Sequence, residues 1–133
     1  MARPKSDQPT PAELEVLKIL WERGPCTVRE VMTIHQERNK RRAYTSVMSL
    51  MNVMAEKGLL TRKPQGRAFI YTARLRRNQT LGNMVGDLWQ RAFEGSASAL
   101  VAHLLDQAHP TDEELEAIRA AIEEYRADGE SSK

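Results

Sequence analysis

The sequence has few of the residues that build crosslinked, metal-binding or membrane-spanning proteins. Cys26 is the only cysteine among 133 residues, which excludes an internal disulfide and a multi-cysteine metal site. No apolar run approaches the roughly 20 residues that a membrane-spanning helix needs. The first residues lead into a polar segment and not into the apolar segment of a secretory signal. The sequence therefore predicts a cytoplasmic protein that does not associate with a membrane.

The sequence also lacks the residue combinations that are typical of catalytic sites. There is no glycine-rich phosphate loop, and the sequence shows neither a nucleophile beside a base nor a carboxylate pair of the kind that lies in a catalytic cleft. His103 and Asp106, with His109 nearby, could form one edge of a metal site, but zinc normally has three or four clustered ligands. Cys26 is either a packed side chain or, if its pKa is lowered, an oxidant sensor. We predict no catalytic activity, no cofactor and no metal.

Charge is distributed unevenly along the chain. Residues 1–78 hold 16 Lys/Arg and 7 Asp/Glu, a balance of +9. Residues 79–133 hold 4 and 11, a balance of −7, and the two balances add up to the net charge of +2. A basic half suits a polyanionic partner. The alternative is two solvated surfaces of opposite sign that attract each other.

Residues 43–58 have the pattern of a helix with two different faces. Apolar side chains recur at helical spacing along one face, and Gly58 follows as a stop signal. Short hydroxyl and amide groups opposite, with arginines upstream, suit a helix in a DNA major groove, although a solvated amphipathic helix has the same pattern. The apolar face is Val47, Leu50, Met51 and Met54, and the polar face is Thr45, Ser46, Ser49, Asn52 and Glu56.

The segments on either side of this helix predict a mainly α fold. Capping boxes at Thr10 and Thr27 predict two earlier helices. After Gly58 the period changes to two short strands, 59–63 and 67–72, joined by a turn at residues 64–66. Three helices followed by a basic hairpin predict a winged helix-turn-helix domain at residues 10–75, preceded by a disordered arm at residues 1–9.

Residues 76–128 predict a second, helical region with strong apolar stripes. One helix ends at Gly95, Ser96 caps another, and a capping box at Thr111 opens a third. About fifty residues are few for an independent core, so we expect the stripes to form a dimer interface; folding back on the first domain is the alternative. Residues 129–133 are predicted to be a disordered tail. The predicted dimer residues are Leu81, Met84, Val85, Leu88, Trp89, Phe93, Leu100, Leu104, Ile118 and Ile122.

Several segments between residues 11 and 73, among them 43–48, 56–60 and 66–71, resemble the penicillinase-repressor (BlaI/MecI/CopY) family of bacterial transcription factors. The resemblance implies a homodimeric repressor whose third helix reads the major groove. By position, Thr45, Ser46 and Ser49 are similar to the family's groove-facing residues, and Arg67 is similar to its wing arginine. The DNA-binding residues that we predict are Arg41, Arg42, Tyr44, Thr45, Ser46, Ser49, Asn52, Arg62, Lys63 and Arg67.

The sequence departs from the family pattern in places that affect contacts and induction. Many members have a capping residue near Ala43 and an arginine near Val53. The copper-responsive branch has a cysteine-rich tail, which this sequence lacks. For the β-lactam branch, the resemblance implies induction by proteolysis of the repressor at an Asn-Phe bond. The corresponding residues here are His103 and Leu104, which do not match. The sequence thus identifies neither an inducing protease nor another inducing signal.

We therefore predict a sequence-specific transcriptional repressor that binds a two-fold symmetric double-stranded DNA operator as a homodimer. The alternative is a winged-helix protein-interaction module that no longer binds DNA. The supply of arginine and lysine near the third helix and the hairpin favours the DNA-binding prediction.

Overall fold

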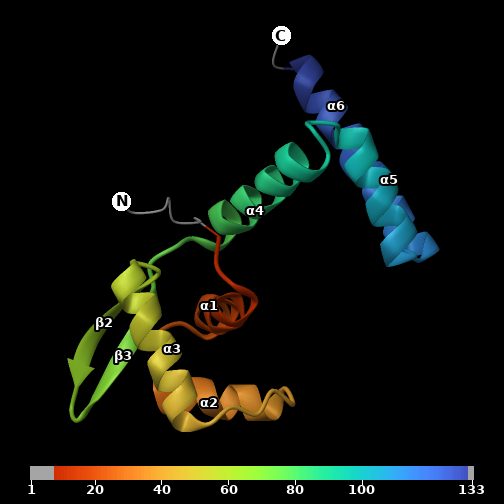
Figure 1. Ribbon diagram of the computed structural model, residues 1–133. Helices are drawn as coiled ribbons and strands as arrows, with labels where there is room; N and C mark the ends of the chain where they lie inside the picture. The colour runs from red at the N-terminus through yellow and green to blue at the C-terminus, as the bar shows by residue number, and fades with distance from the viewer. Residues whose placement is uncertain (1–7, 132–133) are drawn as a thin grey trace. The chain divides into compact units, whose positions relative to one another are not determined.

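The computed structural model describes residues 8–131 (Figure 1). Most of the predicted arm (1–7) and the last part of the predicted tail (132–133) lie outside the described residues. The chain forms two compact units, Met1–Gly86 and Asp87–Lys133. Its elements are α1 (Pro11–Arg23), β1 (Cys26–Thr27), α2 (Val28–Glu37), α3 (Tyr44–Lys57), β2 (Leu60–Gln65), β3 (Ala68–Ala73), α4 (Arg77–Ala92), α5 (Ala97–Ala108) and α6 (Asp112–Ser131). The predicted fold class is confirmed.

Capping boxes set the starts of α1 and α2. Thr10 Oγ1 accepts a hydrogen bond from the Glu13 N–H at 3.2 Å, and Glu13 Oε1 accepts one from the Thr10 N–H at 2.9 Å. Thr27 and Glu30 make the same reciprocal pair. Each box bonds backbone N–H groups that have no partner within the helix. Both predicted helix starts are confirmed.

The β2–β3 hairpin, called the wing below, belongs to a three-stranded antiparallel sheet with the strand order β1-β3-β2. β1 was not predicted, because two residues are too few to show strand alternation. The predicted turn was also placed too early: Pro64 and Gln65 belong to β2, and the two-residue loop is Gly66-Arg67. Proline is tolerated there because β2 is an edge strand. Gly66 supplies the positive φ of 63° that the tight loop requires.

One hydrophobic core joins the first three helices to the sheet. From α3, Val47, Met51 and Met54 enter it with 0% of their surface exposed. Figure 1 shows α3 beside the β2–β3 hairpin, and α3 also contacts α1 and α2. Leu50, predicted for the buried face, only borders this core. The other core residues are Val16, Leu17, Ile19, Leu20, Cys26, Val28, Val31, Ile34, Leu60 and Tyr71.

The second unit is helical and leaves its side chains open. The predicted caps are present: Ser96 Oγ accepts from the Ala99 N–H at 3.2 Å, and Thr111 Oγ1 accepts from the Glu114 N–H at 3.1 Å. No described side chain of α5 or α6 is buried. α6 continues to Ser131, so it includes residues 129–131 of the predicted tail. These helices therefore form without a core of their own in the single chain.

His35 should make the stability of the first unit depend on pH. It is 1% exposed, and its Nε2 has no hydrogen-bond partner. Burial, helped by the charge of Arg42, lowers the His35 pKa below the ordinary 6.5. The unfolded chain then binds a proton below pH 6.5 that the folded chain does not bind, so the free energy of unfolding falls as the pH drops through this range, by at most about 1.4 kcal/mol per pH unit.

Urea denaturation between pH 7.5 and 5.5 would measure this slope, in a range where carboxyl groups stay ionised in both states. His35→Leu is expected to remove most of the slope. The control His109→Asn removes an exposed imidazole at a position that adopts a positive φ of 46°, which asparagine tolerates. An unchanged slope in His35→Leu would contradict the assignment.

Candidate nucleic-acid interface

The helical period separates the two faces of α3. Thr45, Ser46 and Ser49 are exposed, opposite the stripe that enters the core. Tyr44 and Met48 lie among them and are 40% and 37% exposed. The predicted polar face is therefore open, and it also contains an aromatic ring and a thioether.

The cations before α3 are partly neutralised by α1. Lys40 Nζ lies 2.7 Å from Glu15 Oε2, and Arg42 Nη2 lies 3.1 Å from Glu15 Oε1. The hydrogen bond from Lys40, followed by that from Arg42, outweighs burial and lowers the Glu15 pKa. Exposed pairs of this kind contribute only about 0–1 kcal/mol, so phosphates can compete for their cations. The predicted contact Arg41 is exposed.

Asn52 and Arg62, predicted as separate DNA contacts, bind each other. Arg62 Nη1 donates to Asn52 Oδ1 at 2.5 Å, and the Tyr71 hydroxyl donates to the same oxygen at 2.6 Å. Arg62 and Tyr71 are cross-strand partners in the β2–β3 ladder. The carboxamide of α3 is therefore tied to both strands of the wing.

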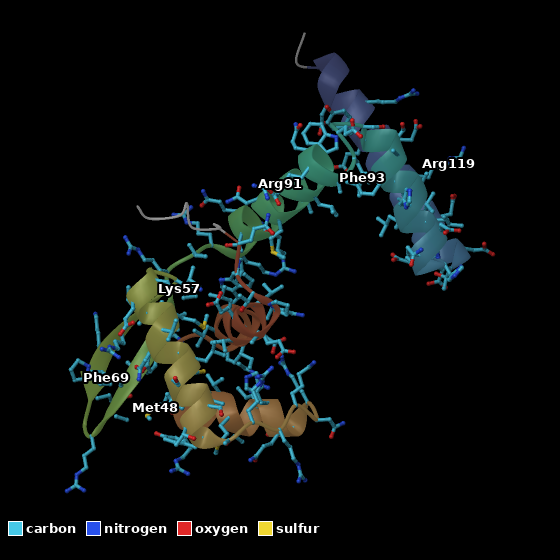
Figure 2. The ribbon with its side chains drawn as sticks, viewed as in Figure 1. Met48, Lys57, Phe69, Arg91, Phe93 and Arg119 are labelled. Carbon is cyan, nitrogen blue, oxygen red and sulfur yellow. The ribbon has the colours of Figure 1, made fainter. Side chains whose placement is uncertain are left out.

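The remaining wing cations are open. Lys63 on β2 and Arg67 in the hairpin loop are both exposed. The guanidinium carbon of Arg62 lies 4.8 Å from the centroid of the Phe69 ring, so it stacks on an aromatic surface. Figure 2 shows Phe69 on the wing and Met48 on α3. The wing thus presents a stacked arginine and two further cations.

A hollow of about 420 Å³ lies between α3, the start of α2 and the wing. The Arg29 guanidinium carbon at its edge is 5.4 Å from the centroid of the Tyr44 ring. Three of the lining residues, Arg29, Met48 and Phe69, were not predicted, because they lie on three separate segments that only the fold brings together. The lining contains no carboxylate, and it includes Arg29, Tyr44, Met48, Arg62, Arg67 and Phe69.

The predicted dimer residues lie on α4, α5 and α6, except for Phe93, which directly follows the end of α4. Four of them have about half of their surface exposed in the single chain: Val85 is 57% exposed, Leu88 47%, Leu104 56% and Ile122 52%. Leu115 and Tyr125 of α6, which were not among the predicted residues, are 41% and 80% exposed. The half-buried predicted residues are Leu81, Met84, Trp89, Phe93, Leu100 and Ile118.

His103, one of the residues considered for metal binding, is in contact with an aromatic ring. The His103 ring packs edge-on to Phe93, with 5.1 Å between the ring centroids. Within residues 8–131 there is no group of three side chains that could hold a metal ion. The same part of the chain has no helix that is long and apolar enough to cross a membrane.

Cys26 is a packed residue of the core. It is 4% exposed, and its thiol donates to the Gly24 carbonyl at 3.4 Å. Burial, with the nearby charge of Glu30, raises the pKa of the thiol. An oxidant sensor needs a lowered pKa and solvent access. Cys26 thus has the environment of the packed side chain and not that of a reactive thiol.

Three helices, a three-stranded sheet and a hairpin wing define a winged helix-turn-helix protein. The family model described as penicillinase repressor matches residues 9–124. The chain belongs to the penicillinase-repressor family, which consists of transcriptional repressors and not of enzymes. The predicted resemblance is confirmed.

Named relatives extend along most of the chain. Over 124 residues it is 23% identical to the penicillinase repressor of Bacillus licheniformis, covering 92% of this chain and 94% of that protein. Over 119 residues it is 34% identical to the transcriptional regulator BlaI of Mycobacterium tuberculosis, covering 86% and 83%. A solved transcriptional regulator from Thermotoga maritima aligns at 20% identity with a TM-score of 0.48, covering 93% of this chain and 80% of that one.

The start of α3 offers a test of the interface helix itself. Ala43 has the extended backbone of an N-cap, with φ −66° and ψ 148°, but it makes no side-chain cap. Ala43→Ser should add a hydroxyl acceptor for the N–H groups of the first turn and raise the free energy of unfolding by about 1 kcal/mol. Ala43→Val, which adds bulk without an acceptor, is the control. Equal stability of the two variants in urea denaturation would contradict this account.

Proposed function

We propose that this chain is a sequence-specific DNA-binding transcriptional repressor that acts as a homodimer on a two-fold symmetric operator. Residues 10–75 bind DNA, and residues 76–128 form the dimer. The observation that carries the proposal is the exposed polar face of α3 beside an arginine-lined hollow. A dimer bound over a promoter blocks transcription by occupying the DNA, with half-sites about one helical turn apart.

In this proposal α3 lies in the major groove. Thr45, Ser46 and Ser49 are short hydroxyl side chains that donate to and accept from base edges. Met48 adds an apolar surface of the kind that contacts the methyl group of thymine. The three hydroxyl side chains are available for the groove because none of them is part of the hydrophobic core.

The DNA backbone next to that groove passes between α3 and the wing. Three arginines line the hollow, one from α2 and two from the wing, and its lining has no carboxylate that would repel a phosphate. A guanidinium that stacks on an aromatic ring keeps its N–H edge free for phosphate oxygens. Arg29 on Tyr44 and Arg62 on Phe69 are stacked in this way, although Arg62 already uses Nη1 to donate to Asn52. Outside the hollow, the exposed residues Arg41, Arg42 and Lys63 add further cations to the same unit.

The second unit supports the homodimer because its apolar side chains have no other cover in the single chain. Leu104, Ile122 and Tyr125 are each more than half exposed. Contiguous apolar side chains left open on a helix mark an interaction surface. A second copy presents the same apolar surface, so a two-fold interface covers both copies at once.

The alternative is a protein-interaction module that has lost DNA binding. Such a module has no use for an arginine-lined hollow beside hydroxyl side chains, and this is the feature that favours DNA. Binding of the purified full chain to a random duplex library separates the two. Selection of one symmetric motif supports the repressor, and a full chain that retains no duplex from the library supports the alternative.

The phosphate and base contacts should respond differently to substitution. Arg29→Ala and Arg67→Ala should each weaken specific and non-specific binding together, and should flatten the plot of log K against log salt by about one unit per protomer. Ser49→Ala should leave the salt slope unchanged and reduce the preference for the selected motif by about 1–3 kcal/mol. Fluorescence anisotropy titrations at several salt concentrations measure both quantities.

The control for these arginine substitutions is Arg126→Ala, which removes an exposed arginine from α6. A salt slope that changes equally in Arg126→Ala and Arg29→Ala would show that the hollow holds no phosphate.

Dimer formation has its own test on α6. Ile122→Glu places a charge where the single chain is already 52% exposed, so it should barely affect the isolated helix but should open an apolar dimer seam. Ala120→Glu is the matched control, because Ala120 is exposed on the opposite side of α6. Sedimentation velocity should show monomers for Ile122→Glu and dimers for Ala120→Glu. A monomeric wild type would contradict the homodimer.

A further inference from the structure

The Asn52 carboxamide has only one orientation that satisfies its neighbours. Its Oδ1 accepts hydrogen bonds from Arg62 Nη1 and from the Tyr71 hydroxyl. A guanidinium can only donate, so the amide oxygen and not the amide nitrogen must face Arg62. Tyr71 is 2% exposed and cannot move away without opening the core. The wing thereby fixes which end of Asn52 remains for another partner.

We propose that Asn52 reads DNA as a hydrogen-bond donor only and rejects cytosine at the base pair that it faces. The proposal rests on the DNA binding proposed above. Asn52 lines the hollow beside α3, and its oxygen is already occupied by two donors. The two N–H groups of Nδ2 are what the side chain can present to a base.

This restriction changes the usual preference of asparagine. A free asparagine pairs with adenine through both its oxygen and its nitrogen, which requires the oxygen to be available. A donor-only amide instead suits the O6 and N7 acceptors of guanine or the O4 of thymine. Cytosine presents its N4 amino group in the major groove, so two donors would face each other. We expect cytosine to lower the affinity at this position about tenfold or more.

The experiment begins with a motif selected by the full-length wild type from random duplex DNA. Asn52→Asp then keeps the shape of the side chain and one oxygen for Arg62 and Tyr71, but replaces the outward donor by an acceptor. Competition binding with duplexes that differ at single base pairs should show the preference inverted at one position: guanine or thymine for the wild type, and cytosine for Asn52→Asp.

A second variant tests the role of the wing. Arg62→Leu combined with Tyr71→Phe removes both donors to Oδ1, so the freed carboxamide should gain affinity for adenine at the same position. Circular dichroism checks that this variant remains folded. Ser49→Ala is the control, because it should change the preference at its own position and leave that of Asn52 unchanged.

Two results would overturn the inference while leaving the proposed function intact. One is a wild-type preference for adenine that Asn52→Ala abolishes. The other is an Asn52→Asp variant whose motif is identical to that of the wild type, while Ser49→Ala shifts its own position. A wild type that selects no motif at all would instead contradict both the inference and the proposed function.

Discussion

The first unit depends on the burial of one stripe of α3. Val47, Met51 and Met54 have no exposed surface, and they join the other two helices to the sheet. Truncating a buried methionine to alanine typically costs about 2–5 kcal/mol, a large part of the stability of a small domain. Because these three side chains fix the rotation of the helix about its axis, they also fix which residues face outward. The exposed hydroxyl face follows from the core.

Polar contacts hold α3 along its length, and each joins it to a different neighbour. Near its end, Lys57 Nζ lies 2.7 Å from a carboxylate oxygen of Glu13, a 3%-exposed residue that also caps α1. Burial acts to raise the Glu13 pKa, but the hydrogen bonds with Lys57 and Thr10 more than offset it, and the pKa is lowered. Farther toward the start, Asn52 is tied to the wing.

The sequence predicted the features whose cause is local. Capping boxes are complete within four residues, and the helical stripe of α3 repeats within two turns, so both could be found without the fold. The comparison with the family pattern indicated that a cap may be missing at Ala43, and Ala43 makes no side-chain cap in the structure. Local patterns also located the hairpin, although Pro64 suggested a turn where the edge position of β2 allows a strand.

The features that the sequence did not predict depend on register and on long-range contact. Arg62 and Tyr71 meet Asn52 only because the β2–β3 register places them opposite each other. A residue-by-residue reading assigned Asn52 and Arg62 to DNA separately, since nothing local indicates that they pair. Arg29 was not predicted because it lies on α2, away from the third helix in the sequence. Its stacking on Tyr44 depends on how α2 packs against α3.

In the proposed function, the two units have a division of labour that explains the charge distribution. The basic unit supplies the phosphate contacts, each of which is individually weak and sensitive to salt. The acidic unit adds no phosphate contact, but it joins two DNA-binding units in one dimer. The second unit therefore meets its half-site at a high effective concentration. Since α5 and α6 bury no described side chain alone, a second copy in this proposal covers the apolar side chains that they leave exposed. Any signal that opens the dimer therefore weakens both half-sites together, without touching a residue that contacts DNA.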